Sequence, residues 1–451
     1  MAFYSINPHT GKTIREFSED SRNDVDQKIS RADRCFQNWK TVPIADRSYL
    51  LIALADRLRN QNRKLAELAT LEMGKPIKQA EAEVEKCAWL CEHYAKNGSR
   101  YLADHKIESD GSQSWVSYEP LGVILGVMPW NFPYWQALRF AVPTILAGNT
   151  ALVKHASNVQ GCAGEIQQLF ESSGFPAGAY QNLRISSEEV ARVIENDAVK
   201  ATSLTGSEKA GSAVAQKSGS EIKKSLLELG GSNAFIVLAD ADLEKTADLC
   251  VNARMQNNGQ SCIAAKRIIL EKTIAEKFTN MLVERIENLK VGDPMDEDVY
   301  VGPVAREDLA AELEKQMDES IRKGASLEIG GERNKAHFSP AIIKDVKPGM
   351  PAFDEETFGP LLSLIEANSA EHAIELCNLS KFGLGATICS ADTDKAIKLA
   401  KKVEDGAVFI NELVKSDPRL PFGGTKISGY GRELGEFGIR EFVNIKTYYV
   451  K

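Results

Sequence analysis

Apolar runs of strand length alternate with helix-length segments from about residue 120 onward, and this alternation limits the fold more than any other feature of the sequence. The first four runs are residues 121–128, 150–153, 180–185 and 201–204. The pattern predicts an α/β fold, in which a largely parallel sheet has helices on its faces and ligands bind beyond the carboxyl ends of the strands. A second unit of the same kind begins at residues 233–238 and continues past residue 400.

The first hundred residues are predicted to be helical. Apolar residues recur there at spacings of three and four, namely Val25, Ile29, Ala32, Phe36 and Trp39. Ser21 is placed to cap this helix, and Pro43 lies beyond its end. Two further helices are expected to stop at Gly74 and at Asn97-Gly98. We expect these helices to be packing layers without chemistry of their own.

Two segments with a hydrophobic period of two are predicted to be strands. One is residues 115–118, and the other is the tail, residues 442–450. The tail is expected to pair with the first strand or with another subunit, because an unpaired strand edge is a ready site for association.

Length and charge exclude several classes of protein. The 451 residues allow about three domains, and the net charge of −8 argues against a general nucleic-acid surface, which needs clustered Lys and Arg. No apolar run approaches the ~20 residues that span a bilayer, and the N-terminus has no secretory signal pattern. We therefore expect a cytoplasmic protein with no nucleic-acid or membrane partner.

The eight cysteines are sparse and irregularly spaced, which predicts reduced thiols and no disulfide framework. Cys87, Cys91 and His93 come closest to a metal-ligand spacing, but packing on one face of a helix is the better explanation for them. No metal site is predicted.

Cys262 differs from most other cysteines because it follows a small polar loop, Asn257-Asn258-Gly259-Gln260-Ser261, after a helix predicted at residues 242–255. A thiol in such a loop is open to a substrate and surrounded by backbone N–H donors. The pattern fits a nucleophile, and it also fits a structural loop cysteine.

Glu228 ends an apolar strand just before Gly230 and Gly231. It is either a solvated strand end or a partly desolvated carboxylate with a raised pKa, suited to removing a proton from water. Asn131 follows another strand end, where an amide either caps the turn or donates to an oxyanion. Gly206 and Ser207 join a strand to a helix whose N-terminus favours a phosphate, although many turns share this pattern.

In this order and at these separations, the motifs resemble those of the NAD(P)-dependent aldehyde dehydrogenase superfamily, and the resemblance covers nearly the whole chain. The motifs are Pro129-Trp130-Asn131-Phe132-Pro133, Thr205-Gly206-Ser207, Leu227-Glu228-Leu229-Gly230-Gly231, Gly259-Gln260-Ser261-Cys262, Glu355-Glu356-Thr357-Phe358-Gly359-Pro360 and Pro421-Phe422-Gly423-Gly424.

The resemblance implies that the chain has three parts and that its copies form a homodimer or homotetramer. A Rossmann-type dinucleotide-binding domain would comprise residues 1–104 and 120–229. An α/β catalytic domain would comprise residues 230–420, and a small β oligomerisation element would comprise residues 105–119 and 421–451.

The resemblance also implies roles for individual residues. Cys262 is expected to be the nucleophile and Glu228 the general base, while the Asn131 amide and the Cys262 backbone N–H form the oxyanion hole. The expected cofactor-binding residues are Trp130, Lys154, Ser157, Gly206, Ser207, Leu229, Glu356 and Phe358. The expected substrate-binding residues are Arg139, Ser261 and Ser416.

These residue types suit aldehyde oxidation. A thiolate adds to the aldehyde to give an alkoxide, which expels hydride to the nicotinamide and leaves a thioester. Glu228 then activates the water that hydrolyses the thioester.

The expected cofactor is NADP or NAD. Many NAD-preferring relatives have at position 157 a glutamate that binds the adenosine ribose. Ser157 would not repel a 2′-phosphate, and Lys154 would attract it. Ala264 stands where some relatives have a second cysteine, so a disulfide switch at that spacing is not expected.

Three segments look most like those of short bacterial succinate-semialdehyde dehydrogenases, which implies succinate semialdehyde as the substrate: residues 154–157, 135–139 and 416–419. Arg139 lies in an apolar stretch and needs an anionic partner, either the far carboxylate of the substrate or an internal acid. Gln256 stands where some semialdehyde enzymes have a second arginine. The alternatives are an enzyme for other small or medium-chain aldehydes, a cysteine hydrolase and an inactive protein with this fold.

Overall fold

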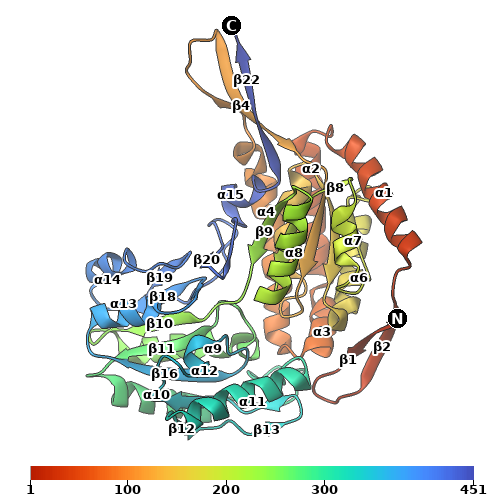
Figure 1. Cartoon of the computed structure of the whole chain (residues 1–451). Helices are drawn as coiled ribbons and strands as arrows, with labels where there is room; N and C mark the ends of the chain where they lie inside the picture. The colour runs from red at the N-terminus through yellow and green to blue at the C-terminus, as the bar shows by residue number, and fades with distance from the viewer. Residues whose placement is uncertain (1) are drawn as a thin grey trace.

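The computed structural model describes residues 2–451, and its two large sheets lie on opposite sides of the molecule (Figure 1). The first has six strands in the order β21-β9-β8-β5-β6-β7. Its strands are β5 (Val123–Met128), β6 (Thr150–His155), β7 (Tyr180–Asn182), β8 (Val199–Thr205), β9 (Lys224–Glu228) and β21 (Gly429–Tyr430). All neighbouring pairs are parallel except β9 and β21, as the alternating pattern predicts.

Helices cover both faces of this sheet, because successive side chains of a strand point to opposite faces. On β5, Ile124 packs against one group of helices, and Val123 and Leu125 pack against the other. The first group is α2 (Ile44–Asn60), α3 (Asn62–Met73), α4 (Ile77–Tyr101), α5 (Trp135–Leu146) and α6 (Gln160–Ser172). The second group is α1 (Arg22–Trp39), α7 (Val190–Glu195) and α8 (Glu208–Ser220).

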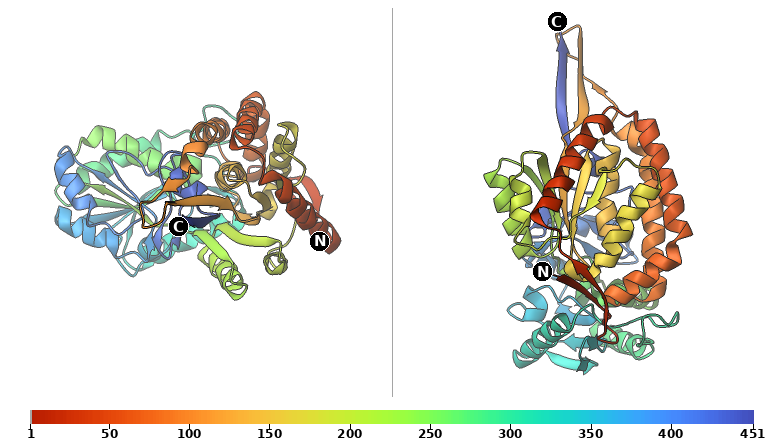
Figure 2. Two further views of the ribbon diagram at one scale, coloured as in Figure 1. Left: turned by 90° about the horizontal axis from the view of Figure 1, so that it is seen from above. Right: turned by 90° about the vertical axis from the view of Figure 1, so that its right-hand side faces the viewer.

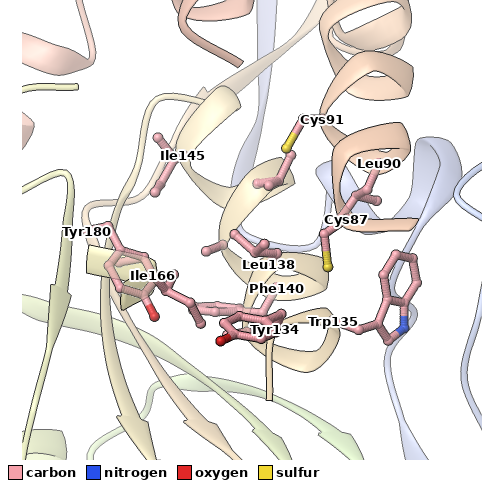
Figure 3. Close-up of a cluster of buried hydrophobic side chains, with 14 of the residues drawn as sticks. Cys87, Leu90, Cys91, Tyr134, Trp135, Leu138, Phe140, Ile145, Ile166 and Tyr180 are labelled. Atoms are coloured by element: carbon pink, nitrogen blue, oxygen red, sulfur yellow. The ribbon is translucent and has the colours of Figure 1, made fainter. Parts of the chain in front are cut away.

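Helix α4 lies against α5, the helix that follows β5. Cys87 and Leu90 of α4 belong to the same buried apolar cluster as Trp135 and Leu138 of α5 (Figure 3). The cysteines of α4 are therefore packing residues, as the sequence predicts.

The second large sheet has seven strands in the order β12-β15-β16-β11-β10-β18-β19. They are β10 (Asn233–Val237), β11 (Ala265–Glu271), β12 (Ser326–Ile329), β15 (Ala341–Lys344), β16 (Leu361–Ala367), β18 (Ala386–Cys389) and β19 (Val408–Ile410). Its helices are α9 (Leu243–Met255), α10 (Ala275–Glu287), α11 (Glu307–Arg322), α12 (Pro351–Asp354), α13 (Ala370–Asn378) and α14 (Thr393–Ala400). The β12–β15 pair is antiparallel, and the other strand pairs are parallel.

A ribbon of three strands projects from the rest of the molecule and has the C-terminus at its tip (Figures 1 and 2). It consists of β3 (His105–Lys106), β4 (Gln113–Pro120) and β22 (Val443–Val450). The pairing of β22 with β4 along its whole length confirms the first of the two predicted partners for the tail. Strand β21, which the sequence groups with the oligomerisation element, instead extends the six-stranded sheet.

Two predictions for the first hundred residues are wrong. Residues 2–18 are not helical but form a hairpin of β1 (Ala2–Ile6) and β2 (Thr13–Ser18). Helix α4 does not stop at Asn97-Gly98 but continues to Tyr101. The glycine there serves packing, because a Cβ on Gly98 would lie 2.4 Å from Leu146 Cδ2. Among the helices in residues 2–451, none combines the length and apolar character needed to cross a membrane.

Candidate active site

Three neighbouring strands of the six-stranded sheet end at residues that are expected to bind ligands. Asn131 follows β5, Ser157 follows β6, and Ser207 follows β8. The three strands are parallel neighbours, so these residues lie at one edge of the sheet although they are far apart in the sequence. The chain order reverses at β5, which lies between β6 and β8, and such a reversal is where ligands bind in open α/β sheets.

The loop before Cys262 has a backbone conformation that few residue types adopt. Asn257 and Asn258, in the short helix η2 (Gln256–Gly259), have φ values of +56° and +58°. This left-handed region favours Asn and Gly. A Cβ on Gly259 would lie 2.2 Å from the carbonyl oxygen of Gly359, so glycine is needed where the motif of residues 259–262 meets the motif of residues 355–360.

The same loop is hydrogen-bonded to Asn131. The Asn131 side-chain amide donates to the carbonyl of Gln260 at 3.1 Å, and the Asn257 amide donates to the carbonyl of Asn131 at 2.7 Å. Asn131 therefore lies beside the segment that leads into Cys262. An asparagine amide has two N–H groups, so one remains to donate to a ligand. Its role as the oxyanion donor stays a prediction.

Lys266, which the sequence analysis missed, fixes the other side of the loop. Its buried ammonium donates to the carbonyls of Ser261 at 2.8 Å and Cys262 at 2.7 Å, and to Glu356 at 2.9 Å. Glu356 also accepts the backbone N–H of Gly231 at 3.0 Å. A charged residue inside the apolar run of β11 was a usable signal, because a buried charge needs partners.

Cys262 is the most accessible cysteine in the chain. Its side chain is half-buried, whereas the other seven cysteines are buried, and all eight are free. Burial raises the pKa of the Cys262 thiol to about 11, although Lys266 and Arg139 oppose the shift. The thiol is therefore protonated near neutral pH and needs a base to form the thiolate.

Glu228 ends β9, as predicted, and is buried there, which excludes the solvated strand end; its surroundings favour the neutral acid. Its Oε1 has no hydrogen-bond partner within residues 2–451. Burial, followed by the nearby carboxylate of Glu433, raises the pKa of Glu228 well above its usual value, while Arg139 opposes the rise. Glu228 also contributes to the raised pKa of Cys262, so the two groups interact.

Arg139 has an internal carboxylate partner, which is one of the two alternatives that the sequence left open. Its Nε forms a buried ion pair with Glu433, Nη2 donates to Thr205 Oγ1 at 3.3 Å, and the guanidinium lies over the ring of Phe422. Of the two partners that the sequence left open, the internal acid is present, because Glu433 is distant in the sequence but adjacent in the fold. Arg139 still lines the cavity described next, and its contact with substrate stays a prediction.

A cavity of about 310 Å³ joins Cys262 to the three residues expected to bind substrate, Arg139, Ser261 and Ser416. Phe132, Trp135 and Phe422 also line it. The volume is at the lower end for ligand pockets, which favours a small substrate.

Residues expected to hold the dinucleotide lie outside this lining. The ammonium of Lys154, half-buried on β6, has neither an ion pair nor a hydrogen bond to any residue from 2 to 451, and burial lowers its pKa. An unpaired, partly buried cation fits a ligand with hydroxyl or phosphate groups. Ser157 is exposed beyond the same strand, and Ser207 caps α8, whose N-terminus favours an anion.

The remaining expected cofactor residues frame the junction of the two sheets. Trp130 and Phe358 meet edge to face, with ring centroids 5.7 Å apart, and Leu229 donates its backbone N–H to Ser428 at 2.9 Å. A Cβ on Gly230 would lie 2.5 Å from Glu356 Oε2, so the chain passes close to this carboxylate. These residues fit a dinucleotide that reaches from the strand ends towards Cys262.

A second buried ion pair includes the cavity-lining Glu83 and was also missed. Lys75 and Glu83 form a fully buried pair, and Glu83 accepts the backbone N–H groups of Tyr134 and Trp135, each at 2.9 Å. These two N–H groups begin α5, just after the Asn131 motif. Glu83 therefore holds the segment that positions Asn131. Within residues 2–451 there is no cluster of His, Cys, Asp and Glu able to hold a metal ion.

Known proteins resemble this chain in sequence and in structure. Residues 1–448 match the Aldehyde dehydrogenase family. The chain is 46% identical to a Synechocystis sp. protein named a probable NADP(+) succinate-semialdehyde dehydrogenase, covering 100% of both chains. It is 45% identical to the Escherichia coli NAD(P)+ succinate semialdehyde dehydrogenase Sad, covering 98% of this chain and 96% of that one. The crystal structure of succinic semialdehyde dehydrogenase from Streptococcus pyogenes with NADP+ superposes with a TM-score of 0.97 at 35% identity, covering 99% of each chain.

Proposed function

This chain belongs to the aldehyde dehydrogenase family of oxidoreductases, and from that premise we propose that it oxidises succinate semialdehyde to succinate with NADP as the hydride acceptor. The observation that supports this most is the cavity in which Cys262 shares a wall with Arg139 and Ser416. The names of the relatives from Synechocystis sp. and Escherichia coli support the same substrate.

Cys262 forms the covalent bond to the substrate in this proposal. A base accepts the thiol proton, and the thiolate adds to the aldehyde carbon while the carbonyl oxygen becomes an oxyanion. The Asn131 amide and the Cys262 backbone N–H donate to that oxygen, each donor contributing about 3 kcal/mol if it acts like other oxyanion-hole donors. A nicotinamide cofactor, when bound, supplies the hydride acceptor for the oxidation, which leaves an acyl group on the cysteine.

Glu228 completes the cycle in this proposal. Its carboxylate removes a proton from a water molecule, whose oxygen attacks the thioester carbon. The C–S bond breaks, succinate leaves, and Cys262 returns as a thiolate. The missing hydrogen-bond partner of Glu228 Oε1 and the raised pKa of the carboxyl support a group that takes up and releases a proton during the reaction.

Lys154 and Ser157 support the choice of NADP. The ammonium of Lys154 has no counter-ion within residues 2–451, and Ser157 places no negative charge beside it. A 2′-phosphate would meet attraction and no repulsion. Changing Ser157 to Glu is expected to shift the preference towards NAD.

The projecting ribbon supports a homodimer or homotetramer. Strand β22 is the outer strand of the ribbon, and its Ile445, Tyr449 and Val450 are exposed. An exposed apolar edge strand favours pairing with another subunit. Degradation of 4-aminobutyrate in the cytoplasm is the setting that we propose.

Steady-state kinetics with a panel of aldehydes, each with NAD and with NADP, tests the proposal. We expect the highest kcat/KM with succinate semialdehyde and NADP, and no oxidation by the Cys262→Ala variant. A higher kcat/KM with neutral aldehydes would favour the alternative substrate class. Ester hydrolysis without cofactor at a comparable rate would favour a hydrolase.

A further inference from the structure

The charged side chains that line the cavity differ in whether the protein neutralises them. The five are Glu83, Lys86, Arg139, Lys415 and Asp417. Four have an ion-pair partner inside the protein, the pairs being Glu83 with Lys75, Arg139 with Glu433, Lys415 with Glu412 and Asp417 with Arg419. Lys86 is the exception, because no carboxylate of residues 2–451 lies within ion-pair distance of its ammonium.

Lys86 is held in place although its charge is unpaired. It projects from α4, where its half-buried ammonium donates to Ser416 Oγ at 3.0 Å and lies 4.0 Å from the centroid of the Trp135 ring. The hydroxyl of Ser416 accepts from Lys86, so its own proton remains free to donate to a ligand. A cation withdrawn from water without a counter-ion is costly, and an anionic ligand would relieve that cost.

We propose that the Lys86 ammonium and the Ser416 hydroxyl together bind the carboxylate of the substrate, so that Lys86 determines the preference for aldehydes with a distal acid group. This inference rests on the proposed oxidation of succinate semialdehyde. It gives the cavity a positive charge without a counter-ion, whereas the guanidinium of Arg139 is paired with Glu433.

The position of Gln256 supports this assignment. Gln256 lines the same cavity and is uncharged, so the loop before Cys262 contributes no cation. Lys86 supplies one from a different element, α4, and the neighbouring aromatic ring of Trp135 provides an apolar wall for the substrate's carbon chain.

The decisive variant is Lys86→Met, which keeps the length of the side chain and removes its charge. We expect KM for succinate semialdehyde to rise about ten- to hundredfold, as when a charge-assisted hydrogen bond is lost, while kcat changes little. KM and kcat for butanal should not change. Lys86→Arg should restore most of the affinity because it restores the charge.

Lys415→Met is the matched control, because Lys415 lines the same cavity but pairs with Glu412 at 2.9 Å. It should leave KM for both aldehydes near the wild-type values. Equal rises in KM for succinate semialdehyde and butanal in Lys86→Met would show a structural role for Lys86 and overturn the proposal.

Binding of succinate, measured by calorimetry, separates this inference from the proposed function. Succinate should bind the Lys86→Met variant at least tenfold more weakly than it binds the wild type. If the wild-type enzyme prefers butanal, the proposed function fails, and the succinate measurement still decides the role of Lys86. Unchanged succinate affinity in the variant would refute that role.

Discussion

Glu83, which lines the cavity, and Glu228, at the end of β9, are almost equally buried, with 4% and 2% of their surface exposed, but their partners differ. Glu83 accepts two backbone N–H groups and pairs with Lys75. Glu228 has an oxygen without a partner, and another carboxylate, Glu433, is close enough to raise its pKa.

The difference shows that burial does not by itself determine what a carboxyl group does. Hydrogen bonds and an adjacent cation fix the buried Glu83 carboxylate in place. Few partners and a neighbouring negative charge favour the protonated acid, which can lose and regain a proton during a reaction. Glu83 therefore belongs to the scaffold of the site, and Glu228 is suited to its chemistry.

The Glu228→Gln substitution should give the largest effect on catalysis. Gln cannot accept the proton of the attacking water, so we expect steady-state turnover to fall about 10²–10⁴-fold while the first acylation remains fast. Rapid mixing should show a burst of NADPH followed by a slow phase. The folding stability should not decrease, because no ion pair or hydrogen bond is lost at Oε1. Normal turnover after the first cycle would contradict the role of Glu228.

The Glu83→Gln substitution should have the opposite profile. It leaves the Lys75 ammonium buried without a counter-ion, which should cost about 3–5 kcal/mol of folding free energy. Chemical denaturation measures this loss. The double variant Lys75→Met, Glu83→Gln should recover much of it, because no unpaired charge remains. Unchanged stability in the single variant would remove the distinction between the two glutamates.

The alternation of apolar runs was sufficient to predict the parallel sheets, because each run is buried on both faces. The N-terminal hairpin was missed for a physical reason. Strand β2 exposes every residue except Phe17, so its sequence has no apolar stripe that could indicate a strand.

Candidate residues within continuous motifs could be proposed from the sequence, as for Cys262 and Asn131. Partners that meet only in the folded chain were not found. Glu433 pairs with Arg139, although the two residues lie far apart in the sequence. Lys86 and Glu83 lie on α4, where charged and apolar residues alternate as is typical of a helix with one solvated face. On such an amphipathic helix, no local pattern distinguishes a charge that lines a cavity from one that faces water.

Arg139→Met tests whether the Arg139 guanidinium lowers the pKa values of the neighbouring carboxyl groups. Arg139 lowers the pKa values of Glu228 and Glu433, so its removal should raise both further. The pH at which turnover rises should then shift upward for succinate semialdehyde and for butanal. We expect a stability loss of about 1–3 kcal/mol, because Glu433 can become neutral by binding a proton.

The same variant compares Arg139 with Lys86. KM for succinate semialdehyde should rise less in Arg139→Met than in Lys86→Met. A loss confined to that KM, with no shift of the pH profile, would identify Arg139 as the main carboxylate ligand instead. Pairing Arg139→Met with Glu433→Gln should restore stability, since the substitution removes both members of the buried ion pair.

The smallest expected effect is the pH dependence of the stability difference between Glu228→Gln and the wild type. The pKa of Glu228 is raised on folding, so between its unfolded value of about 4.3 and its folded value the native state binds more protons than the unfolded state. The stability that Glu228 contributes is complete below the unfolded pKa and is lost as the pH rises through the folded pKa. Gln has no such dependence.

The variant should therefore gain stability relative to the wild type as the pH rises from 5 to 7.5, by at most about 1.4 kcal/mol per pH unit. Denaturant titrations at several pH values measure this slope. Cys262→Ala is the matched control in the same site, because the thiol pKa is about 11 in the folded protein and about 8.5 when unfolded, so neither state loses its proton in that range. If the stability difference between Glu228→Gln and the wild type did not change with pH, Glu228 would already be ionised throughout this range. The contrast with Glu83 would then lie only in the hydrogen bonds that each carboxyl group accepts.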